Sequence, residues 1–162
     1  MTGNFLLDTC AWLDVFNAPE KLKPEVRVLI KYQSVFSIAD VSLLEVARKC
    51  EVGDLILKST IEHWFEVTLP QRRSQILPIT AHIAIESSRL PDPFHKDPAD
   101  RLIVATARIH GLTVITSDRK ILDYPGVASV ASRRPLHQTP HKLPQRRLHI
   151  AEAPPLRHEV ER

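Results

Sequence analysis

Short apolar runs alternate with amphipathic segments along the first 130 residues of the chain. The runs are bounded by polar or turn-forming residues, and "LTVIT" (112–116) is an uncharged run rich in β-branched residues, as is typical of a buried strand. Runs of this kind, without polar alternation, are expected where helices cover both faces of a sheet. We expect strands at 4–8, 34–38, 75–79, 112–116 and 127–130.

The intervening segments place apolar residues three and four positions apart, which is the spacing of a helix with one buried face. Pro24 suits the first turn of a helix, and Gly53 and Gly111 suit the position after a helix end. We expect helices at 9–16, 24–32, 42–53, 60–65, 81–90 and 97–110, with a short helix or turn at 117–124.

Strands that alternate with helices predict βαβ units. The expected fold class is therefore α/β, a three-layer α/β/α domain with a parallel central sheet, spanning residues 1–130. The composition, 43% hydrophobic and 25% charged, is ordinary for a soluble globular protein. We find neither an 18-residue apolar run nor a signal peptide, and we expect no membrane association. Cys10 and Cys50 are expected to be free thiols, which fits a cytoplasmic location.

The net charge of +3 conceals a difference between the two parts of the chain. Residues 1–130 are nearly neutral, whereas residues 131–162 carry 7 Lys and Arg against 3 Asp and Glu, with 5 of the 13 prolines. This basic, Pro-rich C-terminal tail shows no helical or strand period, so we expect it to be extended or disordered. It could contact nucleic-acid phosphates through charge, or it could be a solvated tail with no partner.

Acidic residues stand at the ends of two predicted strands. Asp8 follows the first strand directly, and Asp118 follows "LTVIT" by two residues. Ligands of open parallel sheets bind beyond the carboxyl ends of the strands, so both acids fall where a site is expected. Asp100 lies in the first turn of the helix before "LTVIT", and the pattern leaves open whether this helix begins at the same edge.

Each acid also has a purely structural interpretation. "DPAD" (97–100) is a good helix start, with Asp97 as the N-cap and Pro98 in the first turn, and this interpretation is favoured for Asp97. Ser42 and Glu45 match a capping box, which for Glu45 is as plausible as a role in a site. Asp8 and Asp118 could be turn formers.

Taken together, four carboxylates in a partly buried pocket would repel one another. Hard divalent cations such as Mg²⁺ or Mn²⁺ relieve this repulsion and prefer oxygen ligands. Such ions activate water and stabilise the leaving oxygen in phosphodiester cleavage, so this chemistry predicts a nuclease.

The segments "LLDTCAWL", "SLLEVARK" and "DPADRLIVATARIHGLTVITSDRKILDY" resemble, in order and spacing, the PIN-domain ribonucleases, and in particular the VapC toxins of bacterial type II toxin–antitoxin pairs. The resemblance covers about residues 4–130. It implies catalytic and metal-binding roles for Asp8, Glu45, Asp100 and Asp118, with Asp97 and Thr116 as secondary candidates.

The resemblance further implies a Mg²⁺- or Mn²⁺-dependent endoribonuclease that acts on tRNA or ribosomal RNA. It implies a homodimer, and an antitoxin of the VapB kind that covers the active site. Two alternatives stay open: a non-catalytic RNA-binding or regulatory protein on the same fold, and a phosphatase with Asp8 as nucleophile. The phosphatase is disfavoured because such enzymes usually carry a second acid two residues on, where this chain has Cys10.

Four further residues are candidates for a role in the site or in packing. Trp12 and Trp64 are expected to be packing residues rather than platforms for RNA bases. His95 could touch substrate but is more simply a solvated loop histidine. Arg101 could meet a phosphate or pair with an acid.

Overall fold

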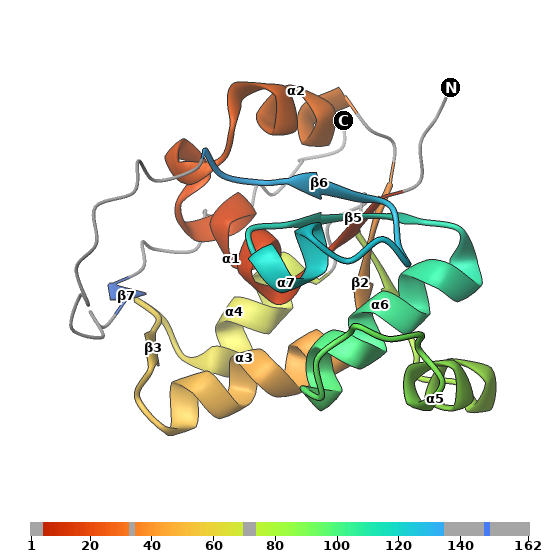
Figure 1. Cartoon of the computed structure of the whole chain (residues 1–162). Helices are drawn as coiled ribbons and strands as arrows, with labels where there is room; N and C mark the ends of the chain where they lie inside the picture. Colours follow the sequence, from red (N-terminus) through yellow and green to blue (C-terminus); the bar gives the residue numbers. More distant parts are fainter. Residues whose placement is uncertain (1–4, 33–34, 70–73, 135–147, 150–162) are drawn as a thin grey trace, which may run out of the picture.

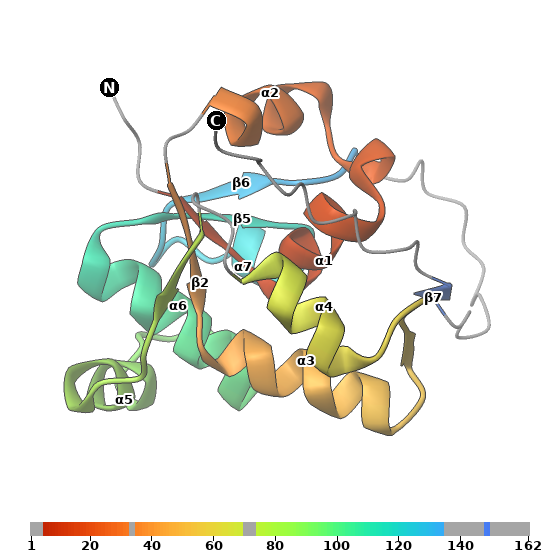
Figure 2. The same ribbon diagram turned by 180° about the vertical axis from the view of Figure 1, so that it is seen from behind.

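A parallel sheet forms the centre of the protein, as seen in the computed structural model (Figures 1 and 2), which describes residues 5–32, 35–69, 74–134 and 148–149. The sheet has five strands in the order β4-β2-β1-β5-β6. Its strands are β1 (Phe5–Leu7), β2 (Phe36–Ala39), β4 (Ser74–Leu77), β5 (Thr113–Thr116) and β6 (Ser129–Ala131). All pairings are parallel, and Leu7 lies between Ile38 and Ile115. The carboxyl ends of β1, β2 and β5 therefore lie side by side.

Helices cover both faces of this sheet (Figures 1 and 2). Successive residues of a strand point to opposite faces of the sheet. In β1, Leu6 accordingly belongs to one hydrophobic cluster and Leu7 to the other. The Leu6 cluster includes residues of α6 and α7, and the Leu7 cluster includes residues of α1 to α4. The predicted three-layer α/β/α fold is confirmed. The helices are α1 (Thr9–Asn17), α2 (Pro24–Tyr32), α3 (Val41–Glu51), α4 (Ile61–Thr68), α5 (Ala81–Ser88), α6 (Pro98–His110) and α7 (Arg119–Leu122), with a 3-10 turn η1 (Pro19–Lys21).

The predicted elements occur with shifted ends, and one predicted cap is wrong. Helix α3 begins at Val41 after Asp40, one residue before Ser42, which lies fully buried inside the helix. The capping box expected for Ser42 and Glu45 therefore does not form, because neither residue stands at a cap position. Both side chains take part in tertiary contacts of α3 instead.

One pairing was not predicted at all. Strand β3 (Leu55–Ile56) pairs in parallel with β7 (Leu148–His149), which comes from the C-terminal tail. Four more residues of this tail, 131–134, are also described: Ala131 completes β6, and Arg133 forms a β-bridge with Leu22. The remainder of the tail lies outside the described residues, so its extended or disordered state stays a prediction.

Aromatic residues fill the core on the Leu7 side of the sheet. Trp12 and Trp64 are fully buried with ring centroids 4.9 Å apart, so their expected role in packing is confirmed. The indole N–H of Trp64 donates to the side-chain oxygen of Asn17. Cys10 and Cys50 are free thiols, as expected. Among the helices of the described residues, none is long and apolar enough to cross a membrane.

Candidate active site at the carboxyl edge of the sheet

Asp8 occupies the carboxyl end of β1, where the chain turns from the sheet into α1. Its side chain caps that helix by accepting a hydrogen bond from the backbone N–H of Ala11 at 2.6 Å. Its second carboxylate oxygen accepts from the hydroxyl of Thr116. Asp8 is only 4% exposed, so a charged group is held in the interior by a small number of donors.

Asp118 lies beside Asp8, at the end of the neighbouring strand β5. Its backbone N–H donates to the Thr116 hydroxyl oxygen at 2.8 Å, and its carboxylate caps α7 by accepting from the N–H of Lys120 at 2.8 Å. Thr116 is fully buried and bridges the two acids. Both acids therefore have a structural function in addition to their position at the edge.

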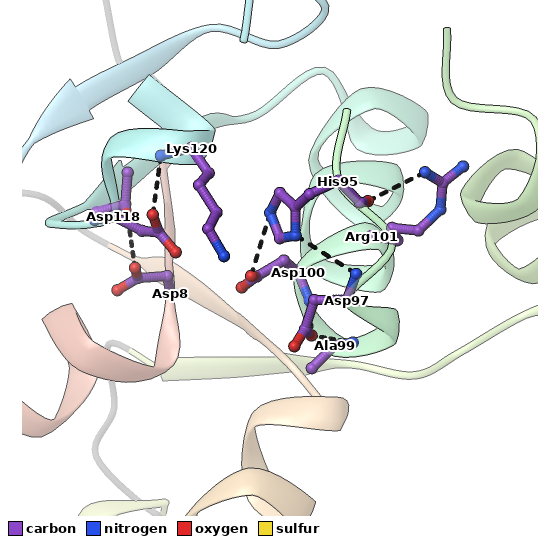
Figure 3. A network of polar contacts seen from close by, with 9 residues as sticks. Asp8, His95, Asp97, Ala99, Asp100, Arg101, Asp118 and Lys120 are labelled. Carbon is purple, nitrogen blue, oxygen red and sulfur yellow. Dashed lines mark hydrogen bonds and ion pairs between the residues drawn. The ribbon is translucent and has the colours of Figure 1, made fainter. Parts of the chain in front are cut away.

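Asp100 reaches the same edge without a strand leading into its helix. Helix α6 runs back along the sheet before the chain enters β5, so its N-terminal end lies at the carboxyl edge (Figure 1). Asp97 caps α6, accepting from the N–H groups of Ala99 at 3.0 Å and Asp100 at 3.3 Å. The cap predicted for Asp97 is confirmed. The carboxylates of Asp8, Asp100 and Asp118 face one region, toward which Lys120 also extends (Figure 3).

His95 stands against Asp100 in the loop before α6. Its Nε2 lies 3.3 Å from Asp100 Oδ2, a contact without the angle of a full hydrogen bond, and is otherwise unpartnered. Its Nδ1 accepts from the N–H of Asp97 at 3.4 Å, which leaves the proton of a neutral ring on Nε2. Arg101 fixes the loop by donating to the carbonyls of Ser87 at 2.8 Å and His95 at 3.2 Å. Arg101 therefore binds backbone carbonyls, and it forms no ion pair with an acid of the described residues.

Glu45 comes from α3 and is held by the first residue of α1. Its Oε2 accepts a hydrogen bond from the hydroxyl of Thr9, which also lies 2.9 Å from the hydroxyl of Ser42. Thr9 directly follows Asp8, so this contact links Glu45 to the first acid through one residue of chain. Thr9 and Ser42 were missed as supporting residues in the sequence. The only feature of the sequence that pointed to this contact was the hydroxyl residue directly after Asp8, which is Thr9.

The acids perturb one another's protonation. Burial is the main cause that raises the pKa of Asp8 to about 6, and the charges of Asp118 and Glu45 raise it further, while the bonds from Thr116 and Ala11 oppose the shift. Burial likewise raises the pKa of Asp100 to about 7, with added repulsion from Asp97, Asp118, Glu45 and Asp8. The four candidate acids thus share one electrostatic environment.

Oxygen donors of this kind fit a hard divalent cation by their chemistry. The repulsion between Asp8, Asp100, Asp118 and Glu45 is what such a cation would relieve. Within the described part of the chain, however, no three His, Cys, Asp or Glu side chains are arranged as a formed metal site. The acidic side chains would have to turn toward a common ion in order to bind it together.

Comparison with known proteins agrees with the fold. The PIN domain family matches residues 5–127. A curated relative from Mycobacterium tuberculosis, "Ribonuclease VapC22", is 31% identical over 103 residues, which are 64% of this chain and 78% of the relative.

Solved structures share the fold at lower identity. A toxin–antitoxin complex from Klebsiella pneumoniae matches with a TM-score of 0.57 at 22% identity, covering 79% of this chain and 97% of that one. VapBC2 from Rickettsia felis, solved with a promoter DNA fragment, matches with a TM-score of 0.59 at 18% identity, covering 78% and 96%. The family match spans most of the chain, and the curated relative named VapC22 is covered over 78% of its length. The chain therefore belongs to the PIN-domain family, and to its VapC type.

Proposed function

We propose that this protein is a Mg²⁺- or Mn²⁺-dependent endoribonuclease that hydrolyses RNA phosphodiester bonds. The observation that carries the proposal is the mutual repulsion of Asp8, Asp100, Asp118 and Glu45, which come from four different elements. Acids kept together against repulsion are typical of a functional site, and burial is the main cause that raises the pKa values of two of them, Asp8 and Asp100. The 31% identity to a protein named as a ribonuclease supports the same activity.

In this proposal Asp8, Asp100 and Asp118 hold the cation, with Glu45 completing the acidic set. The bound ion would supply activation of a water and stabilisation of the leaving oxygen. The residues of this chain orient the ligands: the Thr116 hydroxyl holds one oxygen of Asp8, and Thr9 holds Glu45. His95 Nε2 faces Asp100 and limits its rotation. Supporting contacts of this kind position metal ligands in other proteins.

We further propose a toxin of a toxin–antitoxin pair, acting in the cytoplasm on tRNA or ribosomal RNA. The similarity to VapC22 and to chains solved in toxin–antitoxin complexes supports this role. The partners proposed are a VapB-like antitoxin that covers the carboxyl edge and a second copy of the chain in a homodimer.

The test is cleavage of an end-labelled single-stranded RNA by the purified full chain. We expect cleavage with Mg²⁺ or Mn²⁺, none after EDTA, and none by Asp100→Asn at unchanged circular dichroism. Lys58→Gln, which removes an exposed charge outside the acidic edge, is the matched control. Full cleavage by folded Asp100→Asn would refute the site. Binding of RNA without cleavage would indicate the non-catalytic alternative, and turnover of phosphomonoesters alone would indicate a phosphatase.

A further inference from the structure

A basic cavity adjoins the acidic edge and has no part in the contacts described so far. Its volume is about 480 Å³, and it lies between α7 and the end of β6. Ser117, one of its lining residues, connects Thr116 to Asp118, so the cavity begins where the acidic group ends. The lining residues are Ser117, Arg119, Leu122, Asp123, Ala131, Arg133 and Arg134.

Three arginines and one acid give the lining of this cavity a net positive charge. Arg133 is paired with Asp14, donating from Nε at 2.5 Å and from an Nη at 2.7 Å, so its charge is largely compensated. Arg119 and Arg134 are exposed, and neither guanidinium has a hydrogen-bond or ion-pair partner within the described ranges. Their charge is therefore available to a ligand, with only Asp123 opposing it in the lining.

The Arg133–Asp14 pair is one of several contacts that fix the segment lining this cavity. The backbone carbonyl of Ser132 accepts from the N–H of Lys23 at 2.8 Å, and Arg133 bridges to Leu22. These contacts hold residues 131–134 against the start of α2. Arg134 therefore follows an anchored segment, and it lines the same cavity as the α7 residue Arg119.

We propose that this cavity, called here the arginine cavity, binds the backbone phosphates of an RNA strand on one side of the bond at the acidic edge. The inference rests on the proposed ribonuclease function. A carboxylate cluster repels an RNA backbone, so a strand that reaches it must gain attraction from neighbouring positive charge. Guanidinium groups suit this task because their planar N–H donors match phosphate oxygens. The arginines position substrate and take no part in the chemical step.

The experiment measures RNA binding separately from cleavage. A fluorescein-labelled single-stranded RNA is titrated with the full chain carrying Asp100→Asn, and anisotropy is followed at several salt concentrations. In that background we compare Arg119→Glu, Arg134→Glu and the double variant with Lys58→Glu, an exposed charge reversal outside the arginine cavity. For each arginine removed, we expect weaker binding and a salt dependence of log K shallower by roughly 0.7. Lys58→Glu should retain the parent slope.

Cleavage with Asp100 intact provides the second readout. The double variant should raise KM for a long RNA at nearly unchanged kcat, and should leave cleavage of a dinucleotide unaffected. Unchanged RNA affinity and salt slope in the double variant would overturn the inference, as would loss of antitoxin binding alone. If the wild type cleaves no RNA, the proposed function fails, and the anisotropy comparison still decides the arginine cavity independently.

Discussion

The hydroxyl of Thr116 joins the two acids at the strand ends: it donates to the Asp8 carboxylate and accepts from the backbone N–H of Asp118. This single side chain, fully buried at the end of β5, connects the end of β1 to the start of α7 through two hydrogen bonds. A hydroxyl is the smallest group that can both donate and accept here. Thr116 is therefore a supporting residue of the acidic edge.

Thr116→Val, which keeps the shape and removes the hydroxyl, should lower the free energy of unfolding by about 1–3 kcal/mol, because two buried polar groups lose a partner. The pKa of Asp8 should rise further, since the Thr116 bond is one of the interactions that lower it. The pH profile of RNA cleavage should then move to higher pH. Thr116→Ser is the control and should retain both properties. Equal unfolding and pH profiles for the valine and serine variants would contradict this role.

Asp100 should make the stability of the metal-free protein depend on pH. Its pKa is about 7 in the folded chain and near the ordinary 3.8 when unfolded. Between these values the folded state keeps a proton that the unfolded state has released, so stability falls as pH rises through this range. In EDTA, the melting temperature of the wild type relative to Asp100→Asn should decrease from pH 5 to pH 8. A constant difference between the two proteins would count against the raised pKa.

His95→Ala should reduce RNA cleavage roughly 10-fold, in the range found when supporting residues of metal ligands are removed. The reason is that Asp100 loses the ring nitrogen that lies 3.3 Å from its carboxylate. The apparent affinity for Mn²⁺, read from the metal dependence of cleavage, should weaken in parallel. His95→Gln, which restores an N–H donor, should recover part of the loss. Wild-type metal dependence in His95→Ala would show that the histidine only packs on Phe94.

The Arg133–Asp14 pair should determine how far the C-terminus can be truncated before the protein loses stability. Arg133→Gln should cost about 1.5–3 kcal/mol of unfolding free energy, because Asp14 is only 5% exposed and loses two charged hydrogen bonds. A chain ending after Arg134 should melt close to the full chain, whereas one ending after Ser132 should melt earlier, as measured by thermal denaturation. Identical melting of the two shortened chains would mean that the pair contributes nothing to stability.

The local sequence pattern alone was sufficient to predict the order of the α-helices, the five strands of the central sheet and part of the site. Strands such as Thr113–Thr116 are apolar throughout because both faces are covered, and an acid following such a run must lie at the sheet edge. Asp8 and Asp118 could be placed in this way. The cap at Asp97 was also predictable, since capping depends on three or four consecutive residues. The resemblance to the PIN family then ordered the four acids along the chain.

Contacts between residues distant in sequence decided the rest. No local rule places the start of α6 at the carboxyl edge, because that depends on how the chain crosses the sheet before β5. Glu45 matched a capping box, yet it bonds Thr9, which lies 36 positions away. Arg133 pairs with Asp14 over 119 positions, so a residue from the apparently featureless tail fixes the wall of the arginine cavity. Sequence determined which residues carry the charges; only packing determined which charges meet, because electrostatic and hydrogen-bond energies depend on distance in space rather than along the chain.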